Sequence, residues 1–133
     1  MADITYGYVR GPQVLVTVPV AAASADIKRG DMITISSGYG AQASAGDAIF
    51  GFCVDEADSP SANGGASVSV DISTSSIYRY PIDTGTVAQT NLTNAAAADV
   101  GGAQSVDVTS PSNNDLRIVV VEADTNTFLV QRA

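Results

Sequence analysis

Histidine and tryptophan are absent from the 133-residue chain, and only one cysteine, Cys53, is present. Without histidine the chain lacks the commonest general base and the commonest metal ligand. A single cysteine excludes an intrachain disulfide and favours a reducing folding compartment. These absences predict a protein that is not an enzyme and that holds no metal or other cofactor.

Positive charge is also scarce, because six basic residues stand against 14 acidic ones and the formal net charge is −8. The basic residues are scattered, at Arg10, Lys28, Arg29, Arg79, Arg117 and Arg132. Binding to nucleic acid or to an anionic membrane needs clustered Lys and Arg, so neither partner is expected. No apolar run reaches the ~18 residues of a membrane-spanning helix. The first five residues lack the basic and apolar regions of a signal peptide.

What the chain does contain is short alternating segments separated by Gly, Pro, Asn and Ser. Charged residues make up only 15% of the chain, against about 25% in a typical domain. Small neutral residues take their place, which suits a surface that neighbours cover. Strands are predicted at residues 13–20, 32–36, 41–45, 48–55, 67–72, 77–82, 86–88, 103–108, 116–122 and 127–131.

This pattern predicts an all-β protein, a compact antiparallel β-barrel or β-sandwich of eight to ten short strands. A single β domain is expected over residues 13–133, and residues 1–12 are expected to form an extended N-terminal arm or, alternatively, an edge strand. At most one short helix is expected, near residues 93–99, where Ala95–Ala98 follow possible capping residues. Val14, Val16, Val18 and Val20 are expected to share one face.

The segment Phe50-Gly51-Phe52 carries a glycine between two aromatic residues. The two rings are expected in the core, on one face of a strand. Gly51 then lies on the other face, where a neighbouring chain segment is expected to approach closely. Cys53, inside the same strand, is expected to be a small buried apolar residue.

Three other motifs suggest chemistry, and each has a simpler explanation. Arg29-Gly30-Asp31 matches the adhesion tripeptide that integrins recognise, but Gly-Asp before a strand is ordinary turn chemistry. The acidic residues Asp55, Glu56 and Asp58 lack the spacing of a calcium loop, and a solvated loop explains them. Paired carboxylates for sugar hydrolysis are available in number, but no tryptophan platform accompanies them.

The tyrosines are the best candidates for contact with a partner, because tyrosine buries a large area and keeps a polar end. Tyr6, Tyr8 and Tyr39 lie among glycines in loops, and Arg10 ends the same N-terminal segment. Tyr78 and Tyr80 share one face of a strand, where core packing is an equal alternative. The candidate contact residues are Tyr6, Tyr8, Arg10, Tyr39, Tyr78 and Tyr80.

The chain resembles the capsid decoration, or cement, proteins of tailed bacteriophages. The resemblance covers residues 13–131, and the matching segments are Ile27–Ile35, Ala45–Gly51 and Leu116–Glu122, in a small, acidic chain rich in Ala, Gly, Ser and Thr. It implies a structural virion protein, made in the host cytoplasm, that binds the outer surface of the expanded head. It would bridge major capsid proteins there, with a homotrimer as the expected form.

Two other functions remain open at this stage. A phage tail, fibre or head-surface adhesion module shares the β-rich composition, although fibres usually show repeats and none is found. A small carbohydrate-binding module would need an aromatic platform, and Tyr78 and Tyr80 are the only candidates for one.

Overall fold

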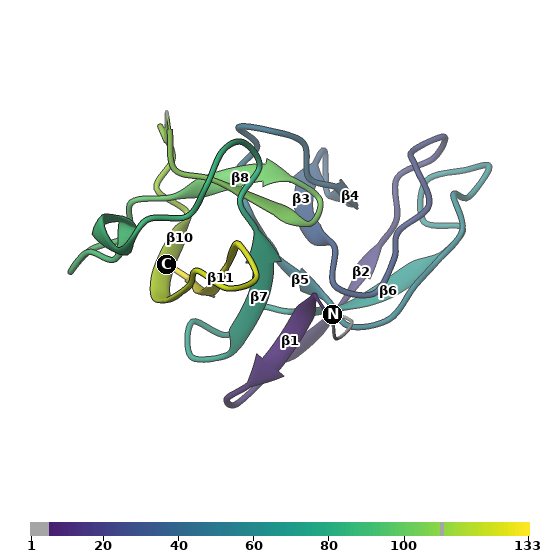
Figure 1. The fold of residues 1–133 in the computed structure, drawn as a ribbon. Helices are drawn as coiled ribbons and strands as arrows, with labels where there is room; N and C mark the ends of the chain where they lie inside the picture. The colour runs from purple at the N-terminus through teal and green to yellow at the C-terminus, as the bar shows by residue number, and fades with distance from the viewer. Residues whose placement is uncertain (1–5, 110) are drawn as a thin grey trace.

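The computed structural model describes residues 6–109 and 111–133, and these residues form eleven β-strands (Figure 1). The all-β class is confirmed, and the described residues contain one strand more than the eight to ten predicted. The strands are β1 (Gly7–Arg10), β2 (Leu15–Pro19), β3 (Met32–Ser36), β4 (Tyr39–Gln42), β5 (Gly51–Cys53), β6 (Ser67–Asp71), β7 (Ile77–Pro81), β8 (Asp99–Gly102), β9 (Ser105–Asp107), β10 (Leu116–Glu122) and β11 (Thr127–Arg132).

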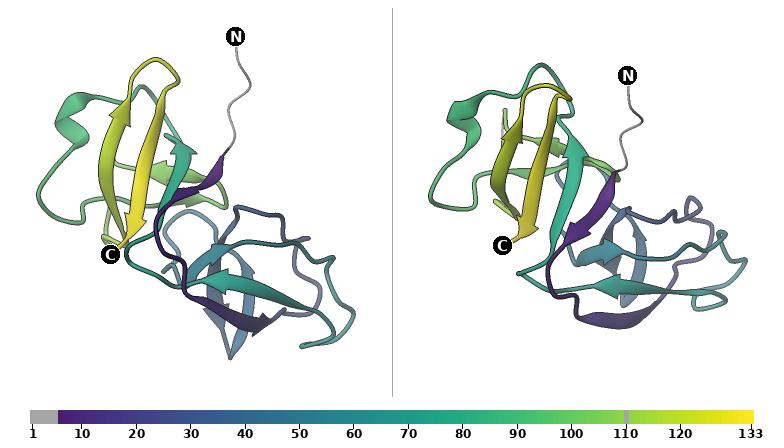
Figure 2. Two further views of the ribbon diagram at one scale, coloured as in Figure 1. Left: turned by 90° about the horizontal axis from the view of Figure 1, so that it is seen from below. Right: turned by 60° about the horizontal axis from the view of Figure 1, so that its bottom comes forward.

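The strands form three antiparallel sheets that together make a compact, sandwich-like fold (Figure 2). Sheet A has the strand order β1-β7-β11-β10, and sheet B has the order β2-β6-β5-β3-β4. Strands β8 and β9 pair as a separate hairpin. No sheet closes into a barrel, although one parallel β-bridge joins Val20, just after β2, to Gly40 of β4. The closed-barrel alternative is therefore wrong and the sandwich alternative fits.

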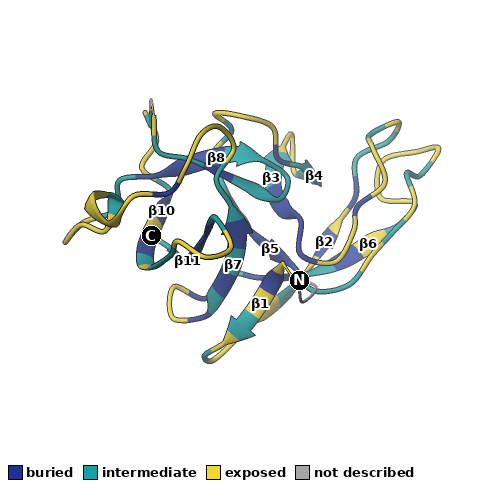
Figure 3. Cartoon of the chain, in the orientation of Figure 1, coloured by how far each residue is buried: buried dark blue, intermediate teal, exposed yellow. Residues whose placement is uncertain are grey.

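Two clusters of buried side chains hold these sheets together (Figure 3). The first is centred on Tyr78, Tyr80 and Phe128 of sheet A, and the second on valines of sheet B. Strand β3 contributes Met32 to the first cluster and Ile33 to the second. Since successive side chains of a strand point to opposite faces, the middle of sheet B is buried on both sides.

Gly51 is a position where the fold requires the absence of a side chain. A Cβ atom there would lie 2.5 Å from the carbonyl oxygen of Asp71 and 2.6 Å from a methyl group of Val70. The close approach predicted at this glycine is therefore confirmed. Of the flanking rings, Phe52 is fully buried in the first cluster, but Phe50 is only partly buried and packs against the second. The prediction that both rings share one core face is wrong.

The helical turn predicted near residues 93–99 does not form. A single 3₁₀ turn, η1 (Gln89–Asn91), lies just before it, and the Asn91 side chain accepts a hydrogen bond from the backbone N–H of Ala88 at 2.8 Å. Ala98 instead makes a β-bridge with Leu116, with two backbone hydrogen bonds of 2.9 and 3.2 Å. Four alanines are too few to nucleate a helix against this pairing. The strand predicted at residues 86–88 does not form either.

The predicted N-terminal arm lies only partly within the described residues, since residues 1–5 are outside them. Residues 7–10 form β1, an edge strand of sheet A that pairs antiparallel with β7. This part of the segment is therefore the edge strand that the sequence left as an alternative. Docking of residues 1–12 on a partner stays a prediction.

Candidate functional site

Exposed apolar side chains concentrate in one short segment of the molecule. Six large apolar residues of the described chain are exposed, and four of these six lie within residues 6–15. They are Tyr6 (40% exposed), Tyr8 (46%), Val14 (52%) and Leu15 (52%), and we call these four residues the N-terminal strip. Single exposed apolar residues are ordinary, whereas a local concentration of them marks a candidate interaction surface.

The topology explains why these residues are uncovered. Strands β1 and β2 follow each other in the chain but are edge strands of different sheets, β1 of sheet A and β2 of sheet B. The segment that joins them therefore runs along the outside of both sheets (Figure 2). Edge positions leave side chains uncovered that would be buried in a central strand.

Tyr8 is held in a fixed position within the strip. Its ring packs edge-on against the buried ring of Tyr78, with centroids 5.6 Å apart, and its hydroxyl donates to the carbonyl oxygen of Gly11 at 2.6 Å. Gly11 has φ +97°, and a Cβ there would lie 2.5 Å from the carbonyl oxygen of Ser75. Because only glycine fits this turn, the backbone after β1 is fixed, and Tyr8 presents a pre-oriented ring.

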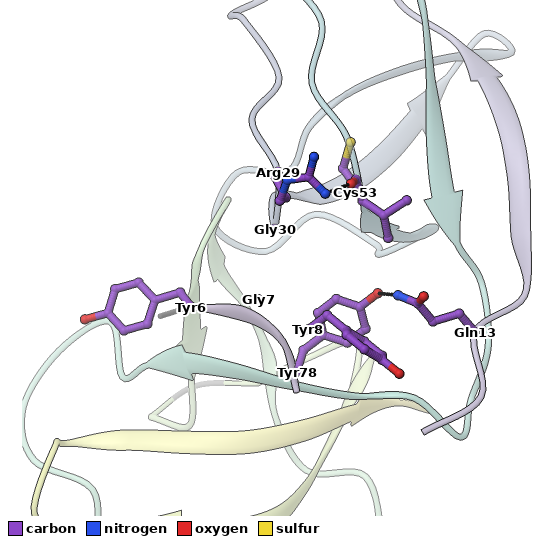
Figure 4. A pocket seen from close by; sticks show the side chains of 9 residues that line it. Tyr6, Gly7, Tyr8, Gln13, Arg29, Gly30, Cys53 and Tyr78 are labelled. Atoms are coloured by element: carbon purple, nitrogen blue, oxygen red, sulfur yellow. Dashed lines mark hydrogen bonds between the residues drawn. The ribbon is translucent and has the colours of Figure 1, made fainter. Parts of the chain in front are cut away.

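A hollow of about 320 Å³ lies beside Tyr8, between the edge of sheet A and the turn that contains Arg29 (Figure 4). We call it the junction hollow. Tyr6, Tyr8 and Tyr78 line one side, and Arg29 and Val54 line the other. Arg29 donates a hydrogen bond to the carbonyl oxygen of Val54, which fixes the guanidinium at the rim. The volume is at the lower end of the range for ligand pockets and is sufficient for one large side chain.

Tyr78 connects the hollow to the core of the protein. Its hydroxyl donates to Oδ2 of Asp71 at 2.7 Å and accepts a hydrogen bond from Gln13 at 3.3 Å. Burial, together with the Asp71 carboxylate, raises the pKa of Tyr78 well above its ordinary value. Asp71 also accepts from the backbone N–H of Val14 at 3.0 Å. One buried carboxylate therefore accepts hydrogen bonds both from the N-terminal strip, at Val14, and from a residue that lines the junction hollow, Tyr78.

The structure separates the six predicted contact residues. Tyr6, Tyr8 and Arg10 are exposed in one segment, whereas Tyr39 is half-buried on β4, the far edge strand of sheet B. Tyr78 and Tyr80 are fully buried, and their rings stack on Phe52 with centroids 3.9 and 6.1 Å apart. The contact prediction does not hold for these two rings, and the core-packing alternative does.

Val14 and Leu15 belong to the site, but the sequence did not indicate them. The alternation of valines predicted a shared face, yet Val18 and Val20 are buried and Val14 is exposed. Pro19, in the same strand, was the available signal, because proline in a strand indicates an edge position.

The remaining motifs have structural roles. Asp31 of the adhesion-like tripeptide is 2% exposed and accepts hydrogen bonds from the backbone of Lys28 and from the side chains of Gln42 and Gln104. Cys53 is buried, as expected, and burial raises the pKa of its thiol to about 12. Within residues 6–109 and 111–133, no group of three or more His, Cys, Asp or Glu side chains is arranged to hold a metal ion.

No protein-family model matches the chain, and neither a curated protein nor a solved structure gives a significant match. In the part of the chain that the structure describes, no helix is long and apolar enough to cross a membrane. The fold and the N-terminal strip are thus the observations from which a function can be inferred.

Proposed function

We propose that the chain is a structural protein that docks on a larger protein assembly through its N-terminal strip. The observation that carries this proposal is the concentration of exposed apolar side chains at Tyr6, Tyr8, Val14 and Leu15, within or next to the edge strands β1 and β2. On the resemblance described above, the assembly is the expanded head of a tailed bacteriophage. The partner is then the major capsid protein, and the protein works as a homotrimer on the outer capsid surface.

The strip supports a modest affinity for each copy. Full burial of a large apolar side chain contributes ~1.5–3 kcal/mol, and these four side chains are already about half-covered. Their complete burial then contributes about 3–6 kcal/mol, which is comparable to the lowest estimates of the cost of association. The strip alone therefore gives weak binding, and further contacts are needed.

The junction hollow supplies one such contact, since it lies beside Tyr8 and opens next to the strip. A side chain of the capsid protein inserted there would bury the rings of Tyr6 and Tyr8 further. Many copies that each bind weakly can still stabilise a shell, because each copy favours the assembled lattice over its separated subunits.

The alternative functions gain no support from the site. The carbohydrate-binding proposal needed an exposed platform formed by Tyr78 and Tyr80, and both rings are fully buried. The tail or fibre proposal predicts nothing specific for an exposed strip at the sheet edges. Docking on a head surface is therefore the proposal to test first.

The test is to add the purified protein to expanded and to unexpanded heads of the phage that carries it. Saturable binding to expanded heads and a higher disruption temperature are the expected results. Leu15→Ser should weaken this binding several-fold, whereas Leu92→Ser, which changes the same residue type at a similarly exposed site outside the strip, should leave it unchanged. Equal binding to unexpanded heads, or no gain in disruption temperature, would contradict the proposal.

A further inference from the structure

Charge is distributed very unevenly between sheet A and the rest of the molecule. The strands of sheet A contain four of the six basic residues of the chain, Arg10, Arg79, Arg117 and Arg132, but only one of its 14 acidic residues, Glu122. These strands therefore carry a formal charge of +3, and the remainder of the chain carries −11. Such a strongly polarised molecule orients charged partners toward one side.

Three of these arginines share the outward face of sheet A. The inward residues of the sheet, Tyr78, Val130 and Leu116 among them, lie in the first core cluster. Arg117 is the neighbour of Leu116, so it points outward, and it is paired with Gln131 of β11. Arg10 is paired with Ile77, the neighbour of Tyr78, and Arg79 lies two residues further along β7. Among the residues that the structure describes, no other segment crosses this face in Figure 2.

The arginines on this face differ in whether they have a close ion-pair partner. Arg79 makes a bidentate pair with Glu122, at 2.8 and 3.0 Å, which neutralises both groups. Arg10 and Arg117 are exposed, and neither makes a hydrogen bond or a close ion pair within the part of the chain that the structure describes, although the charge of Arg10, after the larger effect of Arg79, helps to lower the pKa of Glu122. Three strand spacings separate them, or about 14 Å. We call these two residues the arginine pair.

The same molecule carries an acidic surface in its other half. A β-bridge joins Ile27 to Ala57, with backbone hydrogen bonds of 2.9 and 3.0 Å. This bridge places Asp26 opposite Asp58, and Lys28 opposite Glu56, around a shallow hollow. All four flanking side chains are exposed. We call Asp26, Glu56 and Asp58 the acidic bridge.

We propose that copies of this protein associate head to tail, with the arginine pair of one copy against the acidic bridge of the next. A second copy is the occupant that the charges favour, because the complementary anionic surface is present on this chain itself. The contact joins two different surfaces, so it repeats as an open chain or a closed ring, not as a two-fold dimer. The association concerns the free protein and does not depend on head binding.

The association is weak, because each exposed ion pair contributes little and salt screens it. The net charge of −8 also opposes contact between copies. At about 0.15 M salt the Debye length is about 8 Å, so distant charges are screened while pairs in direct contact still act. Self-association is therefore expected at protein concentrations near a millimolar. Copies that are bound side by side on a common surface reach an effective concentration of the same order.

The test uses sedimentation velocity on two neutralised variants, alone and mixed. Arg10→Gln with Arg117→Gln removes the arginine pair and keeps the acidic bridge. Asp26→Asn with Glu56→Gln and Asp58→Asn does the reverse, and the amide oxygen introduced at position 26 can still accept the bond that Asp26 accepts from the backbone of Ser59. Asp124→Asn, which removes an exposed negative charge outside the acidic bridge, is the matched control.

The wild type and the control should associate beyond dimers at about 1 mM in low salt, and salt near 0.5 M should abolish this. Each neutralised variant alone should associate at least about tenfold more weakly. Mixed, the two variants should form a complex that stops at one copy of each, since only one intact contact remains. A wild type that stays monomeric, an association that salt does not weaken, or a mixture that does not pair would overturn the proposal. Binding of a polyglutamate peptide to the arginine pair of a monomeric wild type would identify an external acidic segment as the occupant instead.

Discussion

Alkaline pH is expected to unfold this protein through three buried groups. Tyr78, Tyr80 and Cys53 are each at most 1% exposed. Burial is the main cause that raises the pKa of all three, to about 12 for Cys53 and well above the ordinary phenol value for both tyrosines. The folded state keeps these protons while the unfolded chain releases them. Their contribution to stability is therefore fully present below about pH 8.5 and is lost as the pH rises.

The size of the effect follows from the number of protons. Each group costs ~1.4 kcal/mol of unfolding free energy for every pH unit above its unfolded pKa. Between about pH 9 and pH 10 only Cys53 lowers the unfolding free energy as the pH rises. From there to about pH 11 all three groups lower it. The accumulated loss at about pH 11 is then ~6 kcal/mol, which is comparable to the whole stability of a typical domain.

The assay is urea denaturation, followed by circular dichroism, at several pH values from about 8 to about 11. Above about pH 10, Tyr78→Phe and Tyr80→Phe should each reduce the slope of unfolding free energy against pH by ~1.4 kcal/mol per pH unit, the contribution of one proton. Cys53→Ala should flatten the slope between about pH 9 and 10. A wild-type stability that stays level up to about pH 11, or a slope indifferent to the three core substitutions, would refute the reasoning.

Three further substitutions test a close approach of two backbone segments, a buried carboxylate and a partly exposed ion pair. Gly51→Ala should destabilise by at least ~1–3 kcal/mol in urea denaturation, because its Cβ would overlap the backbone of β6. Asp99→Asn should cost ~1–3 kcal/mol, because an N–H₂ group then faces the backbone N–H groups of Ser112, Asn113 and Asn114 that the carboxylate accepts. Burial opposes the effect of these bonds, but they lower the pKa of Asp99, so its contribution is present above about pH 4 and the difference from wild type should shrink in stronger acid. Arg79→Met should change stability by under ~1 kcal/mol, because the pair with Glu122 is partly exposed.

The sequence predicted strands best where an alternating pattern lies between turn residues. Met32–Ser36 and Leu116–Glu122 match the observed strands residue by residue. Alternation shows which residues share a face, but it does not show which face is covered. This is why Val14 was expected to share a face with Val18 and Val20, although it is exposed and they are buried, and why core packing and partner contact stayed equal alternatives for Tyr78.

The candidate surfaces could be predicted only where they lie within one segment. Tyr6 and Tyr8 were indicated because they stand together among glycines. Leu15 was not, since its exposure depends on β2 being the last strand of sheet B. The arginine pair comes from strands more than 100 residues apart, β1 and β10, which β7 and β11 separate. In the sequence these two residues are simply scattered charges, and only the strand order and register place them on one face.

Strand β1 contributes Tyr8 to the N-terminal strip and Arg10 to the arginine pair, and it places them on different faces of the sheet. Tyr8 and Arg10 are two residues apart, so in a regular strand they would point to the same side. An irregularity in the pairing lies between them, with Tyr8 opposite Tyr78 and Arg10 opposite Ile77. The extra residue turns Arg10 to the outward face and leaves Tyr8 beside the junction hollow. Because the two side chains lie on different faces of the sheet, we expect a partner on the N-terminal strip to leave Arg10 uncovered. If both proposals hold, a docked copy keeps its outward face free for its neighbour, and Leu15→Ser and Arg10→Gln should weaken two different kinds of binding.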